Sequence, residues 1–200
     1  MEHIEYFDKL IAFLENGIKE YRDIKVLINK GDISKEFEEV FNQIQKINEL
    51  SMLFIIANSD LSISLKNLHI VKNDSEKLFF LKNIFLTIHE VIVVYSANGK
   101  LINSICKDDD QAMEACKTTA ANLKKFKKDF NYDNYIIPLR NNISAHINID
   151  SFYDETIQID IEKTIEMILQ FGNDFLSPAT SLVRILLNSL IYNSLNKSST

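Results

Sequence analysis

Apolar residues recur at helical spacing along most of the chain. In residues 2–30 they stand three or four positions apart, and the same period returns from 35 to about 57. Gly31 lies between the two runs and suits the end of a helix. The pattern therefore predicts two helices in the first third of the chain. It leaves open whether Asn58-Ser59-Asp60 ends the second helix or lies within it.

A third helix is predicted to begin at Asn73-Asp74-Ser75 and to continue through 78–95, which is apolar on almost every side. A helix that is apolar all round is typical of the centre of a bundle. The β-branched run 91–95 and the hairpin dipeptide Asn98-Gly99 leave a strand as the alternative. We favour the helix because the apolar run is too long for one strand and 101–105 does not alternate cleanly.

The middle of the chain predicts a helix, a loop and a new helix. Residues 109–128 begin with acidic residues and end with lysines, which matches the helix dipole. Residues 131–137 are predicted to form a loop, and Pro138 suits the first turn of the next helix. Alternating residues within 147–160 predict a short β-hairpin at the edge of the bundle.

Two helices, 161–176 and 179–195, are predicted to close the chain. Ser177-Pro178 between them fits a cap followed by proline at the first helical position. The absence of an interdomain linker predicts one helical domain, 1–196, with a frayed tail at 197–200. The expected fold is an all-α bundle of about six to seven helices.

Composition supports the helical fold and limits the choice of partners. The whole chain has only four Gly and two Pro, whereas all-β folds spend these residues on frequent turns. A net charge of −6 excludes a general basic coat, so any contact with nucleic acid must be local. Two cysteines do not make a disulfide framework. No signal segment is recognisable, and the last apolar helix is too short to span a membrane. We expect a cytoplasmic protein without membrane contact.

Familiar catalytic and cofactor motifs are absent from the sequence. It contains no Gly-rich phosphate loop, no HExxH, no GxSxG and no paired CxxC. The four histidines lie far apart, and Asp108-Asp109-Asp110 fits the start of a helix better than a cation site. We therefore predict neither a metal site nor a cofactor.

One segment of the sequence suggests a specific chemistry: Arg140-Asn141-Asn142-Ile143-Ser144-Ala145-His146. It resembles the defining motif of the HEPN superfamily, in which an arginine, usually followed by a polar residue, precedes a histidine by four to six intervening residues. Here five residues separate Arg140 from His146, Asn141 is the polar neighbour, and a small Ser-Ala pair precedes the histidine. The resemblance implies a helical bundle of the kind found in bacterial toxins, abortive-infection proteins and RNA-cleaving defence effectors.

These residue types suit cleavage of RNA by its own 2′-hydroxyl. Histidine titrates near neutral pH and can transfer the proton, while arginine stays charged and presents a fork of donors to phosphate. The resemblance implies that His146 transfers protons, Arg140 stabilises charge and Asn141 positions the reacting groups, without a metal. On a regular helix, residues six apart are separated by roughly 240° of rotation and 9 Å of rise. The site would then need Arg140 to bend back, or a homodimer whose two motifs face each other, as the resemblance implies.

Two further features accompany the motif. Basic residues interleaved with aromatics suit single-stranded RNA, although a solvated helix end is the simpler explanation; the candidates are Lys124, Lys125, Lys127, Lys128 and Tyr135. His89-Glu90 interrupts the most apolar helix. We interpret His89 as a satisfied core histidine; the alternative is a buried polar pair that reaches the active site and supports it.

The sequence thus predicts a metal-independent RNA endonuclease of a bacterial toxin or antiphage-defence type. RNA is the expected substrate, and an antitoxin or defence-system protein is the expected partner. One alternative is a non-catalytic HEPN-like module that binds nucleotide or protein. The other is a helical interaction protein.

Overall fold

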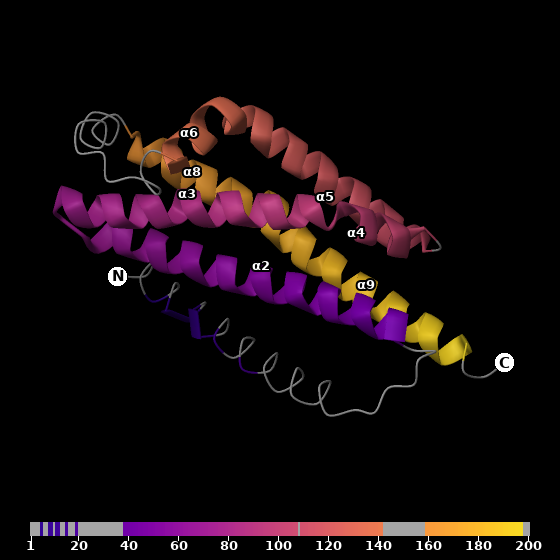
Figure 1. The fold of residues 1–200 in the computed structure, drawn as a ribbon. Coiled ribbons are helices and arrows are strands. Elements are labelled where there is room, and N and C mark those ends of the chain that lie inside the picture. The colour runs from indigo at the N-terminus through magenta and orange to yellow at the C-terminus, as the bar shows by residue number, and fades with distance from the viewer. Residues whose placement is uncertain are drawn as a thin grey trace.

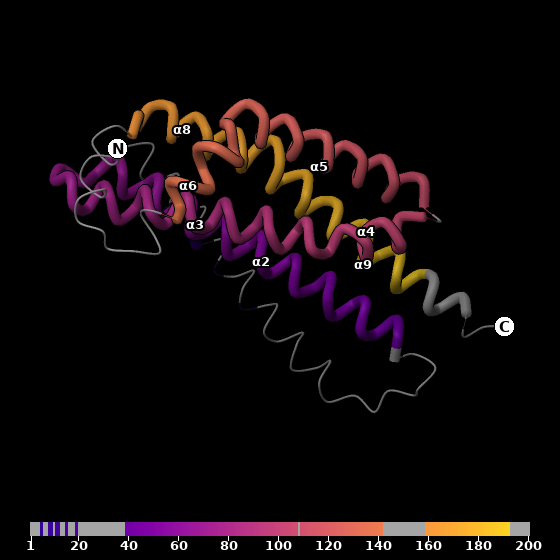
Figure 2. Tube along the Cα trace, turned by 45° about the horizontal axis from the view of Figure 1, so that its top comes forward, coloured from indigo at the N-terminus to yellow at the C-terminus, as the bar shows by residue number. Residues whose placement is uncertain are grey.

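The computed structural model describes residues 38–107, 109–141 and 159–197, together with seven helical residues between 5 and 19. In these ranges every regular element is helical, which confirms the all-α bundle of about six helices. The bundle is elongated, and its long helices run side by side along its length (Figures 1 and 2). The hairpin predicted within 147–160 lies outside the described residues, as does most of the first predicted helix.

Helices α2 (Glu38–Ile70) and α3 (Asp74–Ala97) form an antiparallel pair. α2 continues through Asn58, whose side-chain amide donates to the Phe54 carbonyl of its own helix at 3.0 Å. α3 begins at Asn73, whose side chain accepts from the Glu76 amide at 2.8 Å, a standard N-cap. The β-branched segment 91–95 is helical as predicted, and the strand alternative is excluded.

A short helix, α4 (Gly99–Cys106), follows α3 and was not predicted. The dipeptide Asn98-Gly99 turns the chain between two helices instead of between two strands, and Asn98 also donates its side-chain amide to the Val94 carbonyl. α5 (Asp110–Asp129) confirms the helix predicted at 109–128. Asp109 caps it by accepting from the Ala112 amide at 3.0 Å.

The predicted loop at 131–137 is wrong. Asn131 takes the left-handed conformation, with φ of 47°, and turns the chain sharply after α5. A π-helical segment, η1 (Tyr132–Ile136), follows and leads directly into α6 (Ile137–Arg140). Pro138 lies in the first turn of α6, as predicted. This arrangement puts Tyr132 and Arg140 on one continuous stretch of helical backbone.

The predicted break at Ser177-Pro178 is also wrong. α8 (Ile161–Gln170), the π-helical η3 (Phe171–Leu176) and α9 (Ser177–Lys197) follow one another without interruption. Proline has no amide hydrogen, so Pro178 cannot donate to the carbonyl four residues earlier, that of Asp174. The side-chain amide of Asn122 on α5 donates to this carbonyl instead, at 2.7 Å. A tertiary contact thus replaces the missing hydrogen bond, and the helix continues.

The core lies between α2, α3, α5 and the α8–η3–α9 helix. Its largest fully buried side chains are five phenylalanines from these elements: Phe54, Phe85, Phe126, Phe171 and Phe175. The segments Asp74–Ala97 and Ile161–Tyr192 are long and apolar enough to cross a membrane, but both contribute buried side chains to this core. In each segment 39 % of the most apolar window is buried. The cytoplasmic location stays a prediction.

Candidate functional site

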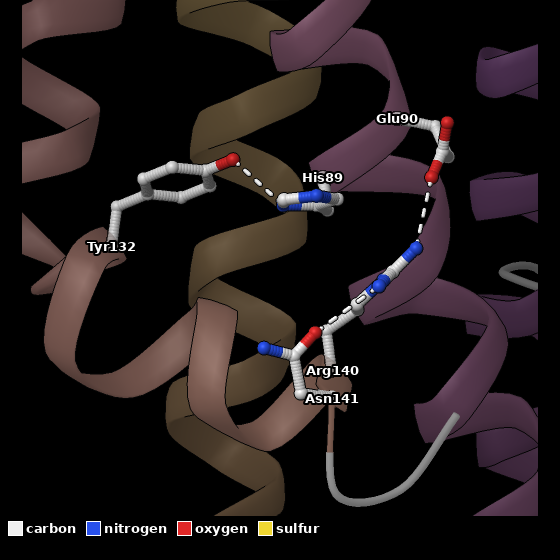
Figure 3. Close-up of polar contacts among 5 residues, drawn as sticks. All are labelled: His89, Glu90, Tyr132, Arg140 and Asn141. Atoms are coloured by element: carbon white, nitrogen blue, oxygen red, sulfur yellow. Dashed lines mark hydrogen bonds and ion pairs between the residues drawn. The ribbon is translucent and has the colours of Figure 1, made fainter. Parts of the chain in front are cut away.

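Arg140, the motif arginine, ends α6 and faces α3 (Figure 3). Its Nη2 lies 3.2 Å from Oε1 of Glu90, and its Nη1 donates to Oδ1 of Asn141 at 3.1 Å. The two contacts orient the guanidinium from opposite sides. The Arg140 side chain is 27 % exposed and that of Glu90 48 % exposed, so the pair is open to solvent.

The same face of α3 presents His89, which pairs with Tyr132 of η1. Its Nδ1 lies 2.9 Å from the Tyr132 hydroxyl, and the two rings are nearly parallel, with centroids 6.0 Å apart. In Figure 3, His89 lies between Tyr132 and the Arg140–Glu90 pair. His89 is half-buried and not part of the core, so the prediction of a core histidine is wrong. Glu90 is exposed and contacts Arg140, whereas the alternative, that the pair supports an active site, stays a prediction.

The electrostatic surroundings keep both members of the His89–Tyr132 pair uncharged. Burial lowers the pKa of His89, and the positive charges of Arg140 and Lys127 lower it further against the opposing effect of Glu90. Burial, with the nearby acids Asp133 and Glu90, raises the pKa of Tyr132 to about 12. At neutral pH the imidazole is therefore mostly neutral and the phenol keeps its proton.

Few contacts with the described residues hold the Arg140 guanidinium. Its Nε is buried and has no hydrogen-bond partner among those residues, so a ligand would have to bind the terminal nitrogens. The contact with Glu90 uses one nitrogen and one oxygen, unlike the two parallel bonds of a bidentate pair. Exposed ion pairs of this kind contribute about 0.2–1 kcal/mol. An incoming phosphate can therefore compete for Arg140 at small cost.

A basic groove lies beside Tyr132, on the α5 side. It has a volume of about 610 Å³. Its lining consists of the basic residues Lys124, Lys127 and Lys128 together with Tyr95, Ala120, Leu123, Asn131, Tyr132 and Asp133. Lys127 places its Nζ 4.9 Å from the centre of the Tyr132 ring, within the range of a cation–π contact. Tyr132 thus borders this groove and also contacts His89.

The structure does not bring all the predicted RNA-binding residues into the groove. Lys125 points elsewhere on α5 and pairs with Asp129 at 2.7 Å, near the acidic residues Glu162 and Glu166. Tyr135 is half-buried and packs edge-on against Phe85. Tyr132, which follows the lysine run in sequence, is the aromatic residue that reaches the groove. Its helical placement after Asn131 could not be seen in a segment predicted to be a loop.

His146 and residues 142–158 lie outside the described part of the chain, so the motif is placed only through Arg140 and Asn141. Within the described ranges, no group of three or more His, Cys, Asp or Glu side chains could hold a metal ion. The absence of a metal and of a cofactor stays a prediction.

Comparisons with known proteins identify no relative: no family model, no curated protein and no solved structure matches the chain.

Proposed function

We propose that this protein is a metal-independent RNA endonuclease of the HEPN type. One observation carries the proposal. The motif arginine, Arg140, is oriented by Asn141 and Glu90 beside a mostly neutral imidazole, that of His89, and its side chain is 27 % exposed. Arginine presents several N–H donors to phosphate oxygens, and the 2′-hydroxyl of RNA supplies the nucleophile, so the chemistry needs positioned charge and proton transfer.

Each motif residue has one part in the reaction. The Arg140 guanidinium binds the scissile phosphate and stabilises the extra negative charge that develops as the 2′-oxygen attacks. Asn141 accepts a hydrogen bond from Arg140, so it positions the guanidinium, with its amide nitrogen turned away (Figure 3). His146 transfers a proton. The products are a 2′,3′-cyclic phosphate and a 5′-hydroxyl.

The basic groove is the proposed path of the RNA strand. Lys124, Lys127 and Lys128 supply local positive charge in a chain whose net charge is −6. The two aromatic residues of the groove, Tyr95 and Tyr132, are buried, so phosphate contacts with the lysines, and not base stacking, would hold the strand. Tyr132 lines the groove and is hydrogen-bonded to His89, which lies beside Arg140. A strand in the groove would therefore run next to the Arg140 site. Lys125 and Tyr135 would contribute little to this path.

The protein is proposed to act in the cytoplasm as a homodimer, because the HEPN-like motif implies two motifs facing each other across an interface. A toxin or antiphage-defence role also follows from that resemblance, and an antitoxin or a defence-system protein would restrain or recruit it. The acidic net charge fits this view, since it opposes indiscriminate RNA binding.

The Arg140–Glu90 ion pair also favours a second candidate, a HEPN-like module that binds nucleotide or protein without cleaving RNA. In that case Glu90 would hold Arg140 permanently, and the phosphate of a bound nucleotide would not react. A helical interaction protein, in which Arg140 serves only the packing of α6 on α3, is the third candidate.

Cleavage of RNA in the presence of a chelator separates the candidates. The full chain is incubated with a labelled single-stranded RNA and EDTA, and the ends of the fragments are analysed. The nuclease predicts fragments with 2′,3′-cyclic phosphate ends. It also predicts a loss of rate of roughly 10²–10³-fold for Arg140→Ala, since removing one preorganised donor typically costs that much, and a comparable loss for His146→Ala.

Arg184→Ala is the matched control, because Arg184 is an exposed arginine on α9 that takes no part in the site. It should cleave as the wild type does. Nucleotide binding without cleavage would favour the binding module. Neither binding nor cleavage would leave the helical interaction protein.

A further inference from the structure

We infer that His89 is a second proton-transferring residue of the Arg140 site and that Tyr132 positions it. This inference rests on the proposed RNA endonuclease and adds two residues from outside the motif. The geometry that carries it is the hydrogen bond between Tyr132 and His89, beside Arg140 and at the edge of the basic groove.

Cleavage through the 2′-hydroxyl needs two proton transfers. The 2′-oxygen loses its proton as its bond to phosphorus forms, and the 5′-oxygen gains one as its bond to phosphorus breaks. The motif contains one histidine, His146. His89 supplies a second imidazole within one protomer, and it approaches Arg140 from α3 instead of from the motif segment.

The contacts of His89 decide which role it takes. Its low pKa leaves the imidazole neutral, so it can accept a proton. The 2.9 Å contact with the Tyr132 hydroxyl fits either tautomer of His89. In the tautomer that the proposal uses, Nδ1–H donates to the Tyr132 oxygen, and the lone pair of Nε2 is the acceptor. His89 then takes the 2′-hydroxyl proton on Nε2. His146, in its protonated form, gives a proton to the departing 5′-oxygen, and solvent restores both residues.

Tyr132 is a positioning residue in this scheme. It stays protonated because its pKa is about 12, and it holds the imidazole through one hydrogen bond and a nearly parallel ring contact. The charged groups that face the pair come from four elements: Arg140 from α6, Lys127 from α5, Glu90 from α3 and Asp133 from η1. The two cations disfavour the protonated imidazole and Glu90 favours it, whereas Asp133 acts on Tyr132.

The first experiment compares single-turnover cleavage by the wild-type chain and by His89→Gln. Glutamine keeps much of the volume and a hydrogen bond to Tyr132 but transfers no proton near neutral pH. We expect a rate loss of roughly 10²–10⁴-fold, the usual contribution of a general base. Binding of a 2′-O-methyl RNA, which has no free 2′-hydroxyl and cannot be cleaved, should be unchanged. His69→Gln, at an exposed histidine in the last turn of α2, should cleave normally.

The second experiment tests the positioning role through the pH dependence of the rate. For the wild type, the rate should fall at acidic pH with a midpoint below 6.5, because His89 must be neutral. Lys127→Gln removes a charge that lowers the pKa of His89, so this midpoint should move to higher pH. Tyr132→Phe should lower kcat with little change in KM.

The outcomes separate the two proposals. If the wild type and His89→Gln cleave at the same rate, the role of His89 is refuted while the endonuclease stands. The same conclusion follows if His89→Gln has lost RNA binding. It also follows if the acidic midpoint of the pH–rate profile is the same in Lys127→Gln as in the wild type. If the wild type does not cleave RNA at all, the endonuclease fails, and with it the catalytic role of His89.

Discussion

Two π-helical segments, η1 and η3, show the same local structure put to different uses. Each stands two residues before a proline, Pro138 or Pro178, and each continues into an α-helix. In η3 the side chains of Phe171, Phe175 and Leu176 are fully buried. In η1 the hydroxyl of Tyr132 instead reaches His89, and the helix that follows ends at Arg140.

The difference teaches that an irregular helix does not by itself mark a functional site. π-helical turns are frequent at such sites, but η3 is accounted for by packing and by the need to pass Pro178. What distinguishes η1 is the chemistry around it: an imidazole, a guanidinium held by Glu90 and Asn141, and three lysines. The contrast between the two segments can be tested by substitutions in each.

The largest effect on stability is expected in η3. Phe175→Ala removes a fully buried ring that contacts Phe54, Tyr95 and Phe171, so the free energy of unfolding should fall by about 3–5 kcal/mol. Chemical denaturation measures this loss. Phe79→Ala makes the same substitution at a ring that is 57 % exposed, and it should cost less than about 1 kcal/mol. Equal losses for the two variants would contradict a packing role for η3.

A smaller loss of stability is expected for the α5 side chain that replaces the hydrogen bond missing at Pro178. Asn122→Ala removes the donor to the Asp174 carbonyl, and the loss should be about 0.5–1.5 kcal/mol. In Pro178→Ala the amide hydrogen returns, so Asn122→Ala should cost less in that background. A double-mutant cycle measures this coupling.

Asn67→Ala is the control for that cycle. Asn67 also donates to a backbone carbonyl at 2.7 Å, that of Ile63, but within a regular helix. The loss of unfolding free energy caused by Asn67→Ala should be the same whether residue 178 is proline or alanine. Full additivity of Asn122→Ala and Pro178→Ala would show that Asn122 does not stand in for the missing backbone donor.

The smallest effects are expected at the ion pair beside η1. Glu90→Gln should lower the free energy of unfolding by less than about 1 kcal/mol, because the pair is exposed and joined by a single contact. It should also lower the pKa of His89 further, since the carboxylate of Glu90 favours the charged imidazole. NMR titration of the His89 ring measures this shift. Glu76→Gln, at the other end of α3, should leave the pKa of His89 unchanged.

The same titration gives the sign of a pH effect on stability. The pKa of His89 lies below 6.5 in the folded protein, so the unfolded chain binds the proton more readily. The contribution of His89 to stability is therefore complete above pH 6.5 and is lost as the pH falls through 6.5 toward the folded-state pKa. His89→Gln should flatten this small dependence. An unchanged slope would mean that His89 is not held neutral by its surroundings.

The sequence by itself determined the helical class and most of the helix starts. Apolar spacing and the residues that begin helices are local features, so the helix starts at Asn73 and Asp109 could be recognised, and Arg140 as the candidate arginine. The prolines were misread for the same reason. A local rule places Pro178 at a helix start, whereas the hydrogen bond that lets the helix continue comes from Asn122, 52 positions away in the chain.

Only the tertiary structure decided the composition of the site. Arg140 meets Glu90 from 50 residues earlier, and Tyr132 meets His89 from 43 residues earlier. No spacing rule predicts such contacts, because they depend on how α6 and η1 pack against α3. Local periodicity fixes which face a helix buries, but the polar neighbours of a side chain at the end of a helix are set by the packing of whole elements.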